Sequence, residues 1–410
     1  MNVHAQKILR RINELAQISE EPGQLTRTFA SPAMRRANEL VAQWMREAGL
    51  QTSVDAIGNL IGRYSCEKPK ARILLLGSHL DTVRNAGKYD GPLGVLLAIA
   101  CLEDLRREKV QLPFDIEVLG FADEEGVRYQ TTYLGSRAVT GAFNPKDLDR
   151  KDAAGIAMRE AISAFGGNLQ PLASARWAPK QIIGYLEAHI EQGPVLEKHN
   201  LSVGVVTSIS GQSRLQIHFI GHAGHAGTTP MNLRVDALCA AAEFVLVVET
   251  IARKQPGLVA TVGRIQAEPG ASNVIPGAVT LTLDVRHQQD TTRRAAVVRL
   301  HKLARQIATR RRIKLTWQPV QQTNSVPCSA PLTKLLTQAV KKHQPKSLAL
   351  PSGAGHDAAV MAGIAPAALL FIRCKKGISH HPAESVKPGD VTVALEVMTD
   401  FIRQLAKLHE

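Results

Sequence analysis

The chain has 410 residues, a length that predicts more than one domain. Its 44% hydrophobic and 21% charged residues are ordinary for a globular protein. A formal net charge of +14 suggests a nucleic-acid partner, but only 4% of residues are aromatic and no basic stretch alternates with base-stacking aromatics. We therefore expect solvated basic faces and no nucleic acid, with the charge helping to attract a small anionic substrate.

We expect neither a membrane segment nor an export signal. The longest apolar stretch, residues 93–102, is far shorter than the ~20 residues that span a membrane. The N-terminal residues contain no apolar signal core. The 5 cysteines are scattered, which favours buried thiols in a reducing compartment over a disulfide framework. These features predict a cytoplasmic protein.

Helices and strands alternate in the first part of the chain. An amphipathic helix begins it, with Ile8, Ile12 and Leu15 on one face. Ser31 and Pro32 start a second helix, the serine as cap and the proline at the first helical position. The next elements are a hairpin at 54–64, a buried strand at 73–79, a helix at 93–107 and a strand at 114–121. This alternation predicts an α/β sheet.

The pattern changes near residue 210. Residues 213–220 alternate polar and apolar side chains, as a strand with one solvated face does. A helix, two strands, a helix and a strand follow at 235–253, 258–265, 279–286, 292–310 and 314–319. This β-α-β-β-α-β order is the ferredoxin-like motif. Since α/β patterning returns from residue 332, we predict a discontinuous domain at 1–210 and 325–410 and an inserted domain at 211–324.

Polar side chains gather where two of the predicted strands end. His79 and Asp81 lie at the carboxyl end of the strand at 73–79 and point to the same side, because residues two apart on a strand point the same way. Asp123, Glu124 and Glu125 follow the strand at 114–121. The carboxyl ends of neighbouring strands form the edge where open α/β proteins place their sites. Crowded carboxylates would repel one another and take up protons, so this pattern predicts a divalent cation.

The candidate metal ligands come from separate segments: His79, Asp90, Glu125, His189 and His380. Imidazole and carboxylate ligands without thiolate suit zinc or manganese, and one bridging carboxylate is enough for a pair of ions. Asp81 is placed to accept the other ring N–H of His79. Glu124 is left to take a proton from metal-bound water. His381, next to His380, is an alternative ligand.

Seven segments carry a resemblance to a known family. They are GSHLDTV (77–83), YDG (89–91), DEEG (123–126), HIEQG (189–193), HAGTTPM (225–231), SGAGHDA (352–358) and ISH (378–380). Nearly end to end, the chain resembles the allantoate amidohydrolase and N-carbamoyl-L-amino-acid hydrolase family, within the dinuclear-metal aminoacylases and carboxypeptidases. HIEQG and HAGTTP separate the ureido-cleaving branch from the peptidases. Asp123 departs from the triple glutamate common in that branch.

The resemblance implies a role for each ligand. His79, Asp90 and His189 would hold one metal, and Asp90, Glu125 and His380 the other. Glu124 would be the general base, with Asp81 orienting a ligand. The fold class implied is α/β: a mixed-sheet metallohydrolase catalytic domain with an inserted ferredoxin-like α+β dimerisation and lid domain.

The resemblance also implies how substrate is held. His225 would reach the partner subunit's site in a homodimer and stabilise an oxyanion. The residues at substrate-binding positions are Gln192, Arg214, His225, Asn273, Arg286 and the backbone of Gly355. A guanidinium fork such as that of Arg286 suits a carboxylate. Without the resemblance, ion pairs on the face of a strand explain Arg214 and Arg286 equally well.

Together these features predict a hydrolase with two divalent ions, Zn²⁺ or Mn²⁺, that cleaves the carbamoyl C–N bond of allantoate or an N-carbamoyl-L-amino acid. A hydroxide generated at the metals would attack, with Glu124 as base. One alternative is an aminoacylase or peptidase of the same group acting on an ordinary amide. A remote alternative is a non-catalytic nucleic-acid-binding protein, with a steep salt dependence of binding.

Overall fold

A computed structural model describes residues 3–174 and 176–409 of the chain in two compact units. The first unit comprises Met1–Thr207, Cys328–Leu350 and Ala354–Glu410, and the second comprises Ser208–Pro327 and Pro351–Gly353. The short segment Pro351–Gly353 falls inside the predicted range 325–410 but belongs to the second unit. There the Ser352 carbonyl accepts the Ser210 N–H at 2.9 Å.

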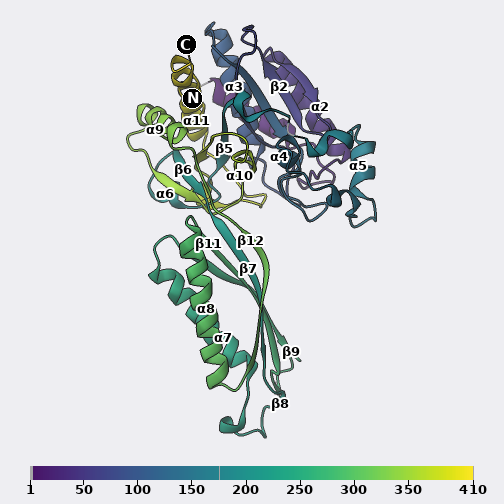
Figure 1. Cartoon of the computed structure of the whole chain (residues 1–410), viewed down its shortest axis with the longest axis vertical. Helices are drawn as coiled ribbons and strands as arrows, with labels where there is room; N and C mark the ends of the chain where they lie inside the picture. Colours follow the sequence, from purple (N-terminus) through teal and green to yellow (C-terminus); the bar gives the residue numbers. More distant parts are fainter. Residues whose placement is uncertain (1–2, 175, 410) are drawn as a thin grey trace. The chain divides into compact units, whose positions relative to one another are not determined.

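A nine-stranded mixed sheet forms the centre of the first unit (Figure 1). Its strands are β1 (Gln51–Val54), β2 (Leu60–Tyr64), β3 (Ile73–His79), β4 (Asp115–Phe121), β5 (Ile182–Ile190), β6 (Val203–Ile209), β13 (Val326–Pro327), β14 (Ala349–Ser352) and β15 (Ala367–Ile372). Their order is β1-β2-β4-β3-β5-β15-β6-β13, with β14 paired to β6. Strand β13 and the last two residues of β6 and of β14 belong to the second unit. The central strands β4, β3, β5 and β15 are parallel, so their carboxyl ends meet at one edge.

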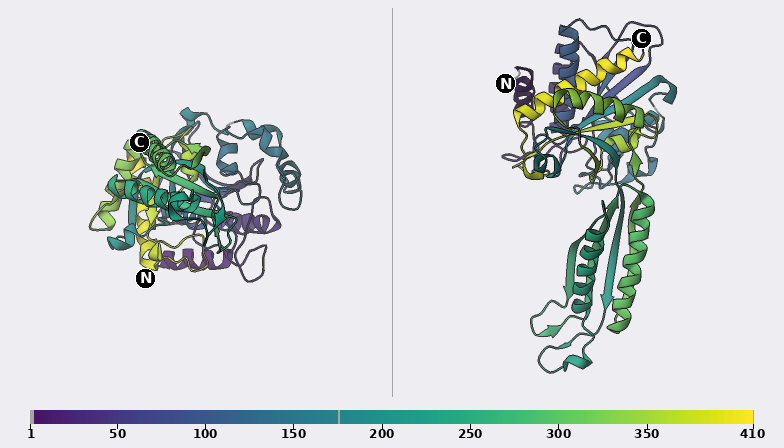
Figure 2. Two further views of the ribbon diagram at one scale, coloured as in Figure 1. Left: turned by 90° about the horizontal axis from the view of Figure 1, so that it is seen from below. Right: turned by 90° about the vertical axis from the view of Figure 1, so that its left-hand side faces the viewer.

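Every residue of these central strands is buried, as is typical of a parallel sheet that is covered on both faces. The helices of this unit are α1 (Val3–Leu15), α2 (Pro32–Glu47), α3 (Pro92–Arg107), α4 (Leu134–Val139), α5 (Met158–Ala164), α6 (Val195–Lys198), α9 (Ala330–His343), α10 (Asp357–Met361) and α11 (Pro388–Lys407). Helix α11, yellow in Figure 2, packs against α3 and α9, and these helices share one apolar core with the strands.

Local sequence signals placed several of these elements correctly. The Ser31 hydroxyl accepts the Met34 N–H at 3.1 Å, and Pro32 is the first residue of α2, which confirms the predicted cap. Strands β1 and β2 form the predicted hairpin, with Val54 opposite Leu60. The predicted α/β class with a mixed sheet is confirmed.

The second unit contains a four-stranded antiparallel sheet in the order β12-β7-β11-β9. Its strands are β7 (Gly211–Ile220), β9 (Val259–Glu268), β11 (Ala278–His287) and β12 (Lys314–Thr323); β8 (Gly224–His225) and β10 (Val274–Ile275) form a separate pair. Helices α7 (Ala237–Lys254) and α8 (Asp290–Arg310) pack on one face and bury alternate residues of β7 and β11 (Figure 1). The alternating polar residues of β7 and β11, among them Arg214 and Asp284, lie on the opposite face.

No helix in the described part of the chain is long and apolar enough to cross a membrane. The cysteines are free thiols, and Cys101 and Cys374 are buried as predicted. The prediction of burial is wrong for Cys239, which is exposed, and Cys66 and Cys328 are half-buried.

Gly94 allows α3 to lie directly against β5. A Cβ at this position would collide with the Ala188 carbonyl oxygen and lie 3.0 Å from Ser78 Cβ. We expect Gly94→Ala to lower the free energy of unfolding by about 1–3 kcal/mol in urea denaturation, because the helix must move off the sheet. Gly389→Ala, in α11, is the control, since a Cβ there meets nothing within 4 Å. Equal stability of the two variants would contradict this packing argument.

Candidate active site

The central strands deliver the predicted ligands to one edge of the sheet. His79 is the last residue of β3, and His189 is the next-to-last residue of β5. Glu124 and Glu125 follow β4, and His380 follows β15. Because these strands are parallel and adjacent, side chains far apart in sequence meet at their carboxyl ends.

Asp90 lies between two groups of these side chains. Its Oδ1 is 3.0 Å from Nε2 of His189 and 3.9 Å from Nε2 of His79. Its Oδ2 is 3.1 Å from Nε2 of His380, which lies 3.3 Å from Oε1 of Glu125. In each group, one candidate ligand atom per residue lies within 4.8 Å of the others. These groups have the same members as the two ligand sets that the family resemblance implied.

Hydrogen bonds direct two of the imidazoles toward Asp90. Nδ1 of His79 lies 3.1 Å from the Asp81 carbonyl oxygen, and Nδ1 of His189 lies 2.9 Å from the Ile190 carbonyl oxygen. A carbonyl oxygen only accepts, so each ring carries a proton on Nδ1, and Nε2 is the ring nitrogen that faces Asp90. Metal-binding histidines are oriented by the same kind of contact.

Asp81 connects the ends of two strands, a role that the sequence did not reveal. Its Oδ1 lies 3.3 Å from Nδ1 of His79, as predicted. The same carboxylate also accepts the backbone N–H of Glu124 at 3.0 Å and of Glu125 at 3.2 Å. The segment after β4 is therefore held against the end of β3, and the Glu124 carboxylate lies within 4.8 Å of ligand atoms of His79 and Glu125.

The buried cluster has an excess of negative charge. Burial opposes protonation of His79, but its contact with Asp81 raises the pKa of the ring well above its usual value. Contacts with Asp90 and then Glu125 raise the pKa of His380 to about 10. The carboxylates thus draw positive charge to the site, which divalent cations would also supply. Imidazole and carboxylate donors without a thiolate suit Zn²⁺ or Mn²⁺.

Two residues around Asp90 were missed in the sequence. Glu384 Oε1 accepts the backbone N–H of Tyr89 at 2.7 Å and of Asp90 at 3.1 Å. Ser379 Oγ lies 3.0 Å from Asp90 Oδ2 and 3.2 Å from Glu384 Oε2. Gln192, predicted to contact substrate, donates to Asp90 Oδ2 at 3.1 Å. The only sequence signal for Glu384 was its place in the segment that holds His380.

The structure distinguishes the two adjacent histidines of the last motif. His380 has a φ of 55° and directs Nε2 to Asp90 and Glu125. Both side chains are exposed, but Nδ1 of His381 accepts the N–H of Ala383 at 3.0 Å within its own turn. Of the two, only His380 belongs to a group of described residues that could hold a metal ion.

In the second unit, His225 and Asn273 lie on neighbouring segments. Strand β8 pairs His225 with Val274 of β10, and the Ala226 N–H donates to the Asn273 carbonyl at 2.9 Å. The N–H of Gly227 donates to Nδ1 of His225 at 3.1 Å. The neutral ring therefore carries its proton on Nε2, which makes this exposed side chain a hydrogen-bond donor.

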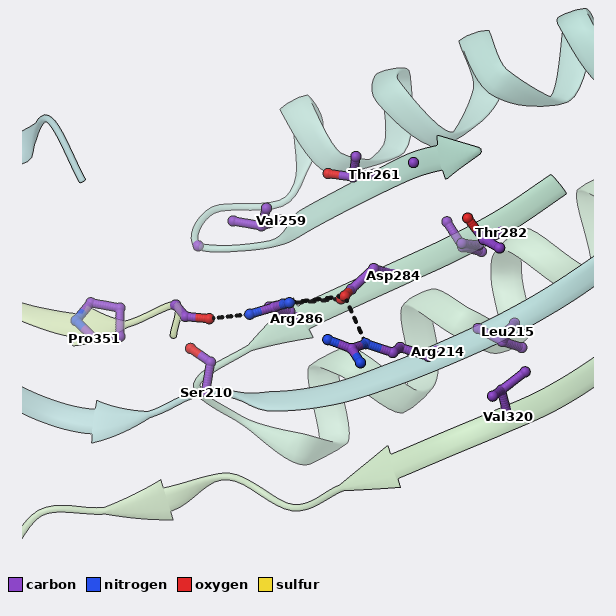
Figure 3. A pocket seen from close by; sticks show the side chains of 14 residues that line it. Ser210, Arg214, Leu215, Val259, Thr261, Thr282, Asp284, Arg286, Val320 and Pro351 are labelled. Carbon is purple, nitrogen blue, oxygen red and sulfur yellow. Dashed lines mark hydrogen bonds and ion pairs between the residues drawn. The ribbon is translucent and has the colours of Figure 1, made fainter. Parts of the chain in front are cut away.

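Arg214 and Arg286 line a pocket of about 740 Å³ in the second unit (Figure 3). Arg286 donates from Nε and Nη2 to the two carboxylate oxygens of Asp284, at 3.0 and 2.9 Å. Arg214 donates from Nε to Asp284 Oδ2 at 3.3 Å. These contacts are the ion pairs on a strand face that were the alternative for both arginines. The sequence analysis did not name Asp284 as the partner, although it stands two residues before Arg286 on the same strand and hence on the same face.

Gly355, the remaining predicted contact, lies in the first unit. A Cβ on this residue would collide with the hydroxyl oxygen of Tyr133. Its exposed backbone therefore borders the Tyr133 hydroxyl with no side chain between them.

The chain is similar to proteins of a known family. Residues 75–404 match peptidase family M20/M25/M40. The chain belongs to that family. It is 40% identical over 432 residues to a probable allantoate deiminase of Oryza sativa subsp. japonica, covering 97% of this chain and 87% of that protein. It is 39% identical over 406 residues to an N-carbamoyl-L-amino acid amidohydrolase of Geobacillus stearothermophilus, covering 99% of each.

A solved structure supports the same placement. The hydantoinase/carbamoylase family amidase from Burkholderia multivorans matches with a TM-score of 0.92 and 29% identity, over 98% of each chain. The resemblance predicted from the motifs is therefore confirmed. As a member of the metal-dependent M20/M25/M40 family, the chain is a hydrolase with clustered residues that could hold metal ions.

The neighbouring histidines provide a test of the metal ligands. If each of the two ligand sets implied by the resemblance holds an ion, His380→Ala should lose about half of the bound Zn²⁺ or Mn²⁺, because the second set loses its imidazole. His381→Ala should keep the wild-type content, which elemental analysis of dialysed protein measures. Equal metal content in both variants, or loss only in His381→Ala, would exclude His380 as the ligand.

Proposed function

We propose that this protein is a two-metal amidohydrolase that cleaves the carbamoyl C–N bond of allantoate or an N-carbamoyl-L-amino acid. The position of Asp90 carries the proposal, because its two carboxylate oxygens face separate groups of candidate ligands. The names of two relatives, an allantoate deiminase and an N-carbamoyl-L-amino acid amidohydrolase, support the substrate class.

We assign one ion to His79, Asp90 and His189 and the other to Asp90, Glu125 and His380. The directed Nε2 atoms and the excess of carboxylate charge support this assignment. When bound, Zn²⁺ or Mn²⁺ would supply Lewis-acid polarisation of the substrate carbonyl and acidify water.

Glu124 is the proposed general base. Burial, followed by the charge of Glu125, raises the pKa of Glu124 well above its usual value, which suits a group that both accepts and returns a proton. It would take a proton from the attacking water and deliver it to the leaving nitrogen. Asp81 holds both the Glu124 backbone and the His79 ring, and so positions the base beside a ligand.

The proposed substrate contacts are the residues that the family resemblance implied. Arg286 would bind the carboxylate, with further contacts from Gln192, Arg214, Asn273 and the Gly355 backbone. The Nε2–H of His225 would donate to the developing oxyanion. We further propose that His225 acts in the partner subunit of a homodimer formed through the inserted domain, and that the protein is cytoplasmic.

A substrate panel tests the reaction. With Zn²⁺ or Mn²⁺, the protein should release ammonia from allantoate or N-carbamoyl-L-amino acids faster than it cleaves N-acetyl amino acids or dipeptides. Glu124→Gln removes the base while keeping the shape of the side chain. We expect its turnover to fall by about 10²–10⁴-fold, with metal content unchanged.

Two outcomes would contradict the proposal in different ways. Preference for N-acetyl amino acids or dipeptides would make the protein an aminoacylase or peptidase of the same family. Undiminished turnover in Glu124→Gln would remove that residue from the chemistry.

A further inference from the structure

We infer that Asp284 is a positioning residue that prepares Arg286 to bind a single substrate carboxylate. The inference rests on the proposed function, because it takes Arg286 as the group that binds the carboxylate. It adds a residue to that site and a reason why the site suits a substrate with one carboxylate.

The hydrogen bonds of Arg286 leave a defined pair of donors. A guanidinium has five N–H groups. Asp284 accepts from Nε and from Nη2, and the Gly353 carbonyl accepts from Nη1 at 2.6 Å (Figure 3). One N–H therefore remains on each terminal nitrogen, and a carboxylate bound bidentately needs two such donors.

Asp284 also controls the charge of the pocket. Its Oδ2 accepts from Gln212 Nε2 at 2.6 Å as well as from Arg286 and Arg214, so three donors converge on one oxygen. Without this carboxylate, the two guanidinium groups would face each other with no anion between them. With it, the three charged side chains carry a net charge of +1, which one substrate carboxylate neutralises.

The surroundings of Asp284 strengthen these contacts. The Asp284 and Arg286 side chains are only 26% and 30% exposed. Val259, directly opposite Arg286 on β9, lines the same pocket (Figure 3). Burial raises the pKa of Asp284, but hydrogen bonds from Arg286 outweigh this effect and bring it below its usual value, so the residue is ionised at neutral pH.

A purely structural ion pair makes a different prediction. If the pair only stabilised the strand, its loss would affect all substrates alike. If Asp284 orients Arg286, its loss matters only for substrates that carry a carboxylate. Comparing an N-carbamoyl-L-amino acid with its neutral carboxamide separates these cases, because only the first can pair with Arg286.

The variant to test is Asp284→Asn in the full-length, metal-loaded protein. The Asn amide would place an N–H against the N–H groups of Arg286, so the guanidinium must turn. We expect the preference for the N-carbamoyl amino acid over its carboxamide, as a ratio of kcat/KM values, to fall at least ~10-fold. The change should lie in KM for the carboxylate substrate, with kcat for that substrate nearly unchanged.

Two further variants complete the test. Asp284→Glu keeps the charge but lengthens the side chain, so the preference should again fall if position matters. Glu249→Gln removes an exposed carboxylate that pairs with Arg253 on α7, and it should leave the preference unchanged. Each variant is checked by its melting temperature.

The possible failures are distinguishable. An unchanged preference in Asp284→Asn and Asp284→Glu, or an equal loss for both substrates, would overturn the role of Asp284 while the proposed function stands. A wild-type protein that hydrolyses no N-carbamoyl substrate, or that shows no preference for the carboxylate form, would overturn the inference together with the substrate assignment on which it rests.

Discussion

Charge compensation around Asp90 is the constraint on which the site depends. A buried carboxylate is stable only with cationic or hydrogen-bonding partners, and here histidine nitrogens face both of its oxygens. Further acidic groups, Glu124 and Glu125, lie at the same edge. Because the parallel strands end at the same edge, side chains from distant parts of the chain converge there and surround Asp90. Cations at this edge would complete the balance, which is why we regard it as the catalytic centre.

Hydrogen bonds outside the ligand groups keep this arrangement in register. Asp81 fastens the segment after β4 to the end of β3. Glu384 holds the backbone that presents Asp90. In the second unit the groups that are held in place are cationic, since Asp284 accepts hydrogen bonds from both Arg286 and Arg214 on one sheet face. In both units, an acidic side chain fixes the group that we expect to contact metal or substrate.

The sequence predicted what depends on local pattern. Fully buried strands such as β3 were predicted because they are runs of apolar residues. The polar residues at the ends of these runs predicted which edge of the sheet holds the site. It missed contacts that depend on distant segments, such as Glu384 with Asp90 and β8 with β10. Strands β9 and β12 extend beyond the predicted 258–265 and 314–319, because their last residues are mostly exposed and polar and gave no hydrophobic signal. Ion pairs of Arg214 and Arg286 were an alternative in the sequence, but Asp284 was not named as the partner because an acidic residue on a solvated strand is common.

The most direct test of the central claim is a crystal structure of the Zn²⁺- or Mn²⁺-loaded protein with diffraction data on both sides of the metal absorption edge. The account predicts two anomalous peaks about 3.5–4 Å apart, with one oxygen of Asp90 on each ion. His79 and His189 should bind the first ion, and Glu125 and His380 the second. A single peak, or two peaks that do not share Asp90, would contradict the account.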